Sequence, residues 1–219
     1  MHKRGASASD DVDKWRTDTH GPIKPLSFQR ERFLQVYRDL QGKRYIYCYG
    51  MVTKHSSHSR ANAEAFSRRV HRIPKAIQKD GGVEYKAEFE RWELDNKILL
   101  QQVSARYDPV ENGGAEVDIE TTMIDALANM DIGAVPGPFW LEAAKYGCEV
   151  ENLISGAWLE VHGRESYERA LKMVMPFGSA CSVVKEVPEM KLEKMQLDQP
   201  CQREEFQLEK DSYSRLEAV

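Results

Sequence analysis

Apolar residues recur at helical spacing through most of the chain and predict a largely helical protein. Between Ser27 and Leu40, apolar side chains follow one another three or four positions apart, and Ser27 suits the N-cap of such a helix. The same spacing predicts a helix over 59–73 that ends before Pro74, and a long helix over 84–107. The apolar stripe of the long helix is narrow, so we expect it to pack against a partner helix.

One segment breaks this pattern. Residues 44–52 are rich in β-branched and aromatic side chains, with Tyr45, Tyr47 and Tyr49 in one alternating set, which is typical of a strand. An isolated strand leaves its backbone groups unpaired, and no clear second strand accompanies it. An irregular or helical conformation therefore stays open for this segment.

Beyond Gly113-Gly114 the pattern predicts a series of short helices joined by tight turns. Asp118 can cap the first, Pro138 can begin the second, and two more are expected over 149–162 and 165–175. Short connections force such helices to lie antiparallel, and helix starts about 31 residues apart are close to the tetratricopeptide period. We therefore predict an all-α fold, a short α-solenoid of tetratricopeptide-like hairpins with extended N- and C-terminal arms.

Charge divides the chain more clearly than its total of −4 suggests. Residues 1–79 carry a net charge of +10 and residues 80–219 a net charge of −14. Such asymmetry is typical of an interaction arm, whose partner could be RNA, anionic lipid or an acidic protein surface. We predict a basic N-terminal extension with one or two helices over 1–80, a helical-repeat module over 84–187 and a charged C-terminal arm over 188–219.

Sequence motifs of common enzymes and metal sites are absent. The chain has no Gly-rich phosphate loop, no Gly-x-Ser-x-Gly elbow and no His-Glu-x-x-His. His55 and His58, with Cys48 or His71, do not have the spacing of a structural zinc site, and solvated loop histidines are the favoured interpretation. We expect no catalytic residue, no cofactor and no metal.

Cysteines and carboxylates offer weaker candidates. The four cysteines are widely spaced and are expected to be reduced. Activation of Cys148 or Cys181 by His162 is conceivable, but small buried core residues are the favoured interpretation. Three carboxylates fall on polar helix faces, where a solvated surface is favoured over paired acid–base chemistry: Asp125, Glu142 and Glu160.

The arginines and tryptophans of the chain have two interpretations. They belong to a solvated helix face and to ordinary core packing, or they form a surface that binds a protein partner. Arginines cluster on the helix expected over 59–73, and tryptophans can stack on a partner. The candidate partner-interface residues are Arg60, Arg68, Arg69, Arg72, Trp92 and Trp140.

Residues 119–187 resemble cytochrome c oxidase subunit Va, a small all-helical subunit of the mitochondrial enzyme. The most distinctive part is the Pro-rich turn at 131–138 between two helices. The resemblance rests on an ordered string of Met123-x-x-x-Leu127, Asp131-Ile132, Val135-Pro136-Gly137-Pro138, Ala143-Ala144, 151–157, 159–161, Tyr167, Leu171, Pro176 and 181–183.

The resemblance implies a non-catalytic accessory subunit of mitochondrial cytochrome c oxidase, respiratory complex IV. Such a subunit lies peripherally on the matrix side of the inner membrane, without a transmembrane helix, haem, copper or small-molecule substrate, and acts through contacts with other subunits. Nucleic acid is disfavoured as a partner, because two helix pairs cannot form an RNA-reading tract and residues 80–219 are acidic. The alternative hypothesis is a helical-repeat protein of a mitochondrial ribosome or RNA-associated complex that uses its basic N-terminal segment.

Overall fold

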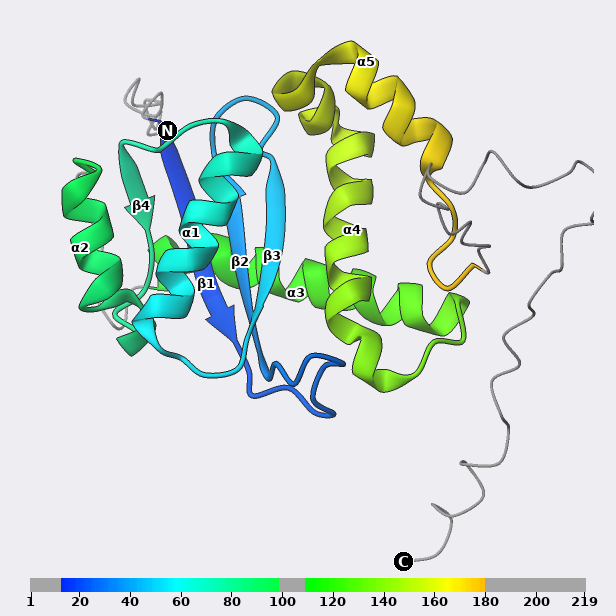
Figure 1. Cartoon of the computed structure of the whole chain (residues 1–219), viewed down its shortest axis with the longest axis horizontal. Helices are drawn as coiled ribbons and strands as arrows, with labels where there is room; N and C mark the ends of the chain where they lie inside the picture. Colours follow the sequence, from blue (N-terminus) through cyan, green and yellow to red (C-terminus); the bar gives the residue numbers. More distant parts are fainter. Residues whose placement is uncertain (1–12, 99–108, 180–219) are drawn as a thin grey trace, which may run out of the picture. The chain divides into compact units, whose positions relative to one another are not determined.

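The computed structural model describes residues 13–98 and 109–179, and side chains from residue 113 onward in the second range. The chain divides into two units, Met1–Ala180 and Cys181–Val219, and every described residue lies in the first. Within that unit a mixed sheet is combined with helices (Figure 1). None of the helices in the described residues is long and apolar enough to cross a membrane.

The sheet has four strands in the order β3-β2-β1-β4. Antiparallel pairing joins β1 to β2 and β2 to β3, whereas β1 and β4 run parallel. The strands are β1 (Lys14–His20), β2 (Phe33–Asp39), β3 (Ile46–Met51) and β4 (Ala76–Gln78). The prediction of an all-α solenoid with an extended N-terminal arm is therefore wrong, because residues 14–78 build a sheet and its first covering helix.

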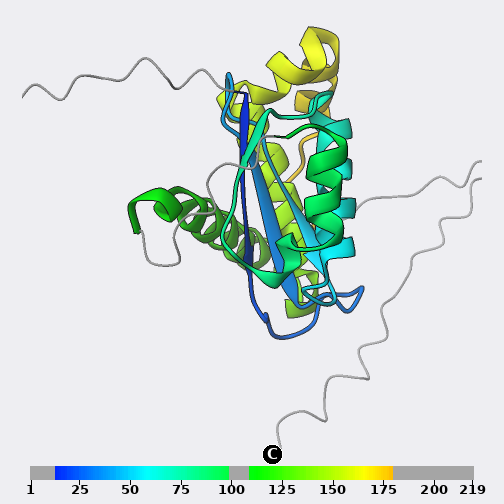
Figure 2. The same cartoon turned by 90° about the vertical axis from the view of Figure 1, so that its left-hand side faces the viewer.

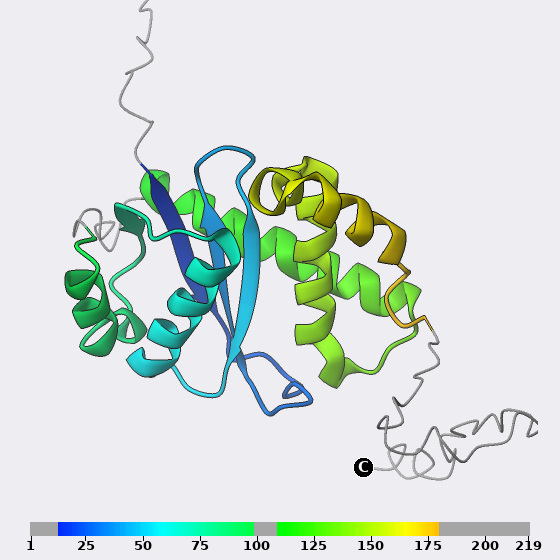
Figure 3. The ribbon, with the colours of Figure 1, turned by 45° about the horizontal axis from the view of Figure 1, so that its top comes forward.

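Helices cover both faces of this sheet. They are α1 (Ser56–Val70), α2 (Glu88–Asp95), α3 (Pro109–Ile132), α4 (Trp140–Ser155) and α5 (Ala157–Met173), with 3-10 turns η1 (Val83–Tyr85) and η2 (Gly137–Phe139). Seen along the sheet, α1 and α2 lie on one side and α3 on the other (Figure 2). Figure 3 shows α5 beside the turn between β2 and β3, after the chain leaves the end of α4.

The helix predicted over Ser27–Leu40 is instead the strand β2. Both faces of this inner strand are covered, so Leu34 and Val36 are buried on one side and Gln35 and Tyr37 on the other. The polar Gln35 is paired there, because its amide donates to Ser59 Oγ at 3.1 Å. A strand buried on both faces loses the apolar–polar alternation that would identify it.

Two other sequence predictions in this half agree with the structure. The helix expected over 59–73 is α1, which begins three residues earlier and ends at Val70. The strand alternative for residues 44–52 is confirmed by β3, and its missing partner is β2, where Val36 pairs with Cys48.

The long helix predicted over 84–107 is shorter and begins with a 3-10 turn. Tyr85, Phe89 and Trp92 are buried as the stripe predicted, but α2 ends at Asp95. Asn96 forms its C-cap, and Lys97 adopts a φ of 56°, outside the helical region. Residues 99–107 of this prediction lie outside the described part of the chain.

Glycine conformation also moves the predicted helix boundaries in the C-terminal half. A helix was expected over 149–162, but Gly156 has a φ of 77° and separates α4 from α5. Gly163, where that helix was expected to stop, has a φ of 78° and produces a kink inside α5. Side chains other than glycine rarely adopt this left-handed region, which is why the chain turns at these two points.

The core lies mainly between the sheet and α1, and a second layer lies beneath α3 and α4. Trp15 of β1 contacts Phe66 of α1 edge-on, with ring centroids 4.8 Å apart, and both are fully buried. On the other face, Cys48 of β3 and Cys148 of α4 are buried in the same apolar cluster. This packing holds β1 rigidly at the centre of the unit.

Asn152 connects α4 to the first residue of β3, and its replacement tests that contact. Its side-chain oxygen accepts from Ile46 N–H at 2.9 Å, and its amide nitrogen donates to the Ile46 carbonyl at 2.7 Å. Asn152 is fully buried, so Asn152→Ala leaves backbone groups unpaired and should lower the free energy of unfolding by about 1–3 kcal/mol.

Urea denaturation measures this loss. The matched control is Asn129→Ala on α3, a partly exposed asparagine, with an expected change of about 0.5 kcal/mol or less. Equal losses in the two variants would contradict the bridging role of Asn152.

Candidate functional site

Two aspartates meet at the carboxyl ends of the parallel strands β1 and β4. Arg16 of β1 pairs with Gln78 of β4. Asp80 lies two residues beyond the end of β4, and continuation of the same register places it level with Asp18. These two strands are neighbours in the sheet, so the pairing brings together carboxylates that are remote in the sequence (Figure 1).

Helix α3 brings a third carboxylate, Glu116, to this end of β1. Asp118 on the same helix accepts from Arg16 at 2.6 Å, and Arg38 Nε donates to the other Asp118 oxygen at 2.6 Å. A Cβ at Gly114 would meet the Arg16 guanidinium, so glycine leaves room for the Arg16–Asp118 ion pair beside the helix. Side chains alternate along a strand, so Asp18 faces the same side as Arg16, toward α3.

Burial and the neighbouring carboxylates both act on the pKa of Asp18. Burial raises the pKa of Asp18 from its ordinary value of 3.8 to about 6, and repulsion from Asp80 and Glu116 adds to the rise. The Thr19 backbone N–H, which donates to Asp18 Oδ1 at 2.7 Å, and the positive charge of Lys54 act in the opposite direction. The site therefore holds negative charge at a free-energy cost, as functional sites often do.

The loop after Asp80 fixes a fourth carboxylate and a lysine beside the cluster. Gly82 N–H donates to Asp80 Oδ1 at 2.9 Å. A Cβ at Gly82 would lie 2.9 Å from this oxygen and 2.5 Å from Glu84 Oε2, so both carboxylates border the same glycine. The other oxygen of Glu84 is 3.1 Å from Lys54 Nζ.

Buried contacts hold the surroundings of Asp80 in place. Lys79 and Glu93 form a buried ion pair that connects the end of β4 to α2, and Lys79 Nζ also lies 4.6 Å from the centroid of the Phe89 ring. On the face of β1 opposite Asp18, the Tyr85 hydroxyl is 3.2 Å from Thr19 Oγ1. These contacts fix the backbone on both sides of Asp80.

The donor atoms suit a hard divalent cation, although the cluster is not closed around one. Asp18, Asp80 and Glu116 offer only oxygen ligands, the type that Mg²⁺ prefers. Within residues 13–98 and 109–179, no three His, Cys, Asp or Glu side chains are placed to hold one metal ion together. Mg²⁺ commonly takes only one or two carboxylates from the protein and completes its shell with water and phosphate oxygens, so the aspartate pair fits it.

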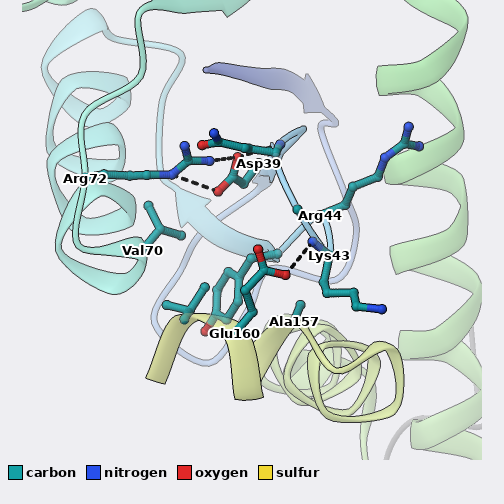
Figure 4. Close-up of a pocket in the computed structure, with 11 residues that line it drawn as sticks. Asp39, Lys43, Arg44, Val70, Arg72, Ala157 and Glu160 are labelled. Atoms are coloured by element: carbon teal, nitrogen blue, oxygen red, sulfur yellow. Dashed lines mark hydrogen bonds and ion pairs between the residues drawn. The ribbon is translucent and has the colours of Figure 1, made fainter. Parts of the chain in front are cut away.

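A cavity of about 410 Å³ lies elsewhere, among the β2–β3 turn, the C-terminal end of α1 and α5. Its charged groups largely satisfy one another: Arg72 Nε donates to Asp39 at 3.1 Å and Lys43 N–H donates to Glu160 at 2.8 Å (Figure 4). Figure 4 also shows the Lys43 and Arg44 side chains directed away from the Arg72–Asp39 pair. The cavity therefore presents no set of convergent free groups.

The four arginines assigned to a partner interface do not form one free patch. Arg60 pairs with Glu64 one helical turn away, and Arg72 pairs with Asp13 and Asp39. The Arg69 guanidinium carbon lies 3.4 Å from the centroid of the Tyr47 ring, whereas Arg68 is exposed. Two of the four are thus engaged in contacts that connect α1 to the sheet.

The tryptophans of the same hypothesis lie in the core. Trp92 is 5% exposed and Trp140 is 3% exposed, and the Trp140 indole N–H donates to the Pro25 carbonyl at 3.1 Å. Both side chains therefore contribute to packing within this chain.

The remaining candidates occupy separate places. His55 caps α1 by accepting from Ser57 N–H, Cys148 is buried beside Cys48, and Cys181 lies outside the described residues. His162 contacts Trp158, with ring centroids 4.7 Å apart. Three carboxylates lie apart from the cluster at Asp18: burial raises the pKa of Asp125, Glu142 Oε2 is buried, and Glu160 borders the cavity of Figure 4.

Comparison with known proteins identifies the fold and no family. No family model matches the chain, and no curated protein is similar to it at a significant level. A chain in the cryo-EM structure of the simian T-cell lymphotropic virus intasome, in complex with PP2A regulatory subunit B56 gamma, matches with a TM-score of 0.55 and 16% identity. The match covers 80% of the present chain but only 60% of that chain.

The HTLV-2 integrase catalytic core domain in complex with magnesium, in its trimeric form, matches with a TM-score of 0.47 and 13% identity over 62% of the present chain and 83% of the other. At these identities the comparison shows a shared α/β fold alone, and that only for the intasome chain. The resemblance of residues 119–187 to cytochrome c oxidase subunit Va is not tested by these comparisons and stays a prediction.

Proposed function

We propose that Asp18 and Asp80 bind a divalent cation, with Glu116 beside the site, and that this unit acts on phosphodiester bonds of nucleic acid. The observation that carries the proposal is the placement of Asp18 beside Asp80 under the helix that bears Glu116. Carboxylates crowded at a partly buried position repel one another, and a divalent cation relieves that repulsion. Carboxylate-bound metal ions serve polymerases and nucleases in this way.

The residues of the chain have separate roles in this proposal. Asp18 and Asp80 supply the oxygen ligands, and the N–H groups of Thr19 and Gly82 orient them by hydrogen bonds to one oxygen of each carboxylate. Glu116 is exposed near the start of α3, so its carboxylate can contact water or substrate groups bound to the cation. When bound, the cation supplies Lewis-acid polarisation and lowers the pKa of water.

The basic charge of the N-terminal part favours a polyanionic substrate. Residues 1–79, which carry the net charge of +10, include the strands that position Asp18. Several of their cationic side chains are exposed: Lys24, Arg30, Arg32, Lys43, Arg44, Arg68 and Lys75. Such charge attracts phosphate backbones without sequence preference. The fold shared with a chain of a viral intasome agrees by analogy alone.

Calorimetric titration with Mn²⁺ or Mg²⁺ tests the cation site. Asp80→Asn removes one ligand charge and should weaken binding at least about tenfold. Asp131→Asn, an exposed aspartate at the far end of α3, is the matched control and should bind as the wild type does. Cation-dependent nicking of a labelled DNA duplex should be lost in Asp80→Asn only. Equal cation affinity in the wild type and Asp80→Asn would overturn the proposal.

We keep as a second proposal that the unit is a protein-contacting accessory subunit of cytochrome c oxidase. Five large apolar side chains are more than half exposed on α3 and α4: Val117, Ile124, Leu127, Ile132 and Ile154. Exposed apolar side chains on neighbouring helices favour a protein partner. Purification of the endogenous protein should then recover haem-containing oxidase subunits, and recovery of the chain without them would contradict this proposal.

A further inference from the structure

Lys54 occupies the loop between β3 and α1, on the border of the carboxylate cluster. Its ammonium is 3.1 Å from Glu84 Oε1 and 5.7 Å from the centroid of the Phe33 ring. The two partners of the ion pair differ in exposure, because the side chain of Glu84 is 2% exposed and that of Lys54 is 35% exposed. A buried carboxylate thus restrains the ammonium of Lys54, while part of the Lys54 side chain faces solvent.

The same ammonium reaches the cluster electrostatically. Its charge lowers the pKa of Asp18, against the effects of Asp80 and Glu116. Glu84, its partner, borders Gly82 together with Asp80, as the close approach of both carboxylates to that glycine shows. Through Glu84 and Gly82, the ammonium of Lys54 is thus connected to the loop that carries Asp80.

We infer that Lys54 binds a phosphate group of the nucleic-acid strand that the carboxylate cluster acts on. This inference rests on the proposed function. A phosphate that approaches oxygen ligands of net negative charge needs a positive group nearby, and lysine supplies one as a point charge. Glu84 restrains the side chain in advance, which lowers the conformational entropy lost when the phosphate binds.

A purely structural role is the competing explanation. In that case the ion pair would only connect the β3–α1 loop to η1, and its loss would affect stability rather than nucleic-acid binding. Lys54→Gln alone would confuse the two, because it leaves Glu84 buried and unpaired. The double variant Lys54→Gln/Glu84→Gln removes both charges and keeps two amides that can bond to each other.

Fluorescence anisotropy with a fluorescein-labelled DNA duplex, titrated at several salt concentrations in the presence of Mg²⁺, tests the inference in the full chain. The double variant should bind the duplex about three- to tenfold more weakly, with a salt slope reduced by about one. Lys54→Arg should retain the slope of the wild type. Lys172→Gln, which removes an exposed lysine on α5, controls for the loss of one lysine and should change neither value.

Wild-type affinity and slope in the double variant, or losses equal to those of Lys172→Gln, would overturn the inference. A second experiment adds inorganic phosphate to the protein–duplex complex. If phosphate displaced the duplex at a concentration comparable to that of the duplex, the ligand of Lys54 would be free phosphate rather than a phosphate of the strand. Mn²⁺ affinity, measured without DNA, separates this result from the proposed function: Lys54 variants should retain it, whereas Asp80→Asn should lose it.

Discussion

Asp18→Asn is expected to stabilise the protein at pH 8 by about 2–3 kcal/mol and to make no difference near pH 3. The folded-state pKa of Asp18 is about 6, above its ordinary value of 3.8, because burial and the neighbouring carboxylates disfavour its charged form. The folded state therefore binds more protons than the unfolded state between these values, and stability from this group falls as the pH rises through that range. Asparagine carries no charge and avoids the loss.

Urea denaturation of the wild type and Asp18→Asn across pH 3–8 measures this difference. Asp131→Asn controls for the change in net charge on an exposed site of the same unit. Saturating Mg²⁺ should narrow the gap at pH 8, since a cation at about one hundred times its Kd stabilises the wild type by about 2.7 kcal/mol and finds a weaker site in the variant. If the variant were less stable than the wild type at pH 8, the claim that the charged Asp18 carboxylate destabilises the folded state would be wrong.

Asp118→Asn is expected to have the opposite effect and lower the free energy of unfolding by about 3–5 kcal/mol. Asp118 is 6% exposed and accepts from Arg16 and Arg38 on two adjacent strands. The variant removes the negative charge and leaves the Arg16 guanidinium, 17% exposed, without its carboxylate. Arg38 keeps Glu151 at 2.9 Å, so the loss falls mainly on the contact between α3 and β1.

A double-mutant cycle with Arg16→Ala and Asp118→Ala separates this pair from other effects of each substitution. A coupling energy of at least about 1.5 kcal/mol is expected for a partly buried charged pair. Asp131→Asn on the same helix again provides the exposed comparison. A cycle with no coupling would show that the Arg16–Asp118 ion pair does not stabilise the contact between α3 and β1. Hydrogen exchange in α3 should increase in Asp118→Asn if the ion pairs hold the helix.

Local patterns gave good predictions wherever one face of an element is apolar and the other is solvated. The helix α1 follows such a pattern, with Ala63, Phe66 and Val70 buried, and the sequence placed it within a few residues. The alternating tyrosines of β3 likewise indicated a strand. These elements carry their own periodicity, so no knowledge of their neighbours was needed.

The strands β1 and β2 could not be recognised in this way. β1 alternates Trp15 and Thr17 with Arg16 and Asp18, and the charged set is half-buried under α3, which supplies Asp118 for the arginine. From the local pattern alone, such charged side chains are predicted to be exposed to solvent. This is why residues 1–26 resembled an extended arm and why the fold class was predicted as all-α.

The candidate site was missed for the same reason. Asp80 follows a strand of only three residues, and Glu116 lies on a helix whose pattern predicted nothing about its neighbours. One signal was present: Asp18 stands near the end of an alternating segment, and Asp80 stands three residues after the apolar pair Ala76-Ile77. Two strands would have to be recognised as parallel before that signal had meaning.

The sequence by itself determined the amphipathic helix α1, the strand rich in tyrosine and the concentration of positive charge in residues 1–79. Only the tertiary structure decided that the N-terminal part is a sheet and that Asp18, Asp80 and Glu116 share one site. The physical reason is that periodicity is local, whereas the parallel pairing of β1 with β4 and the ion pairs of Asp118 join residues far apart in the chain.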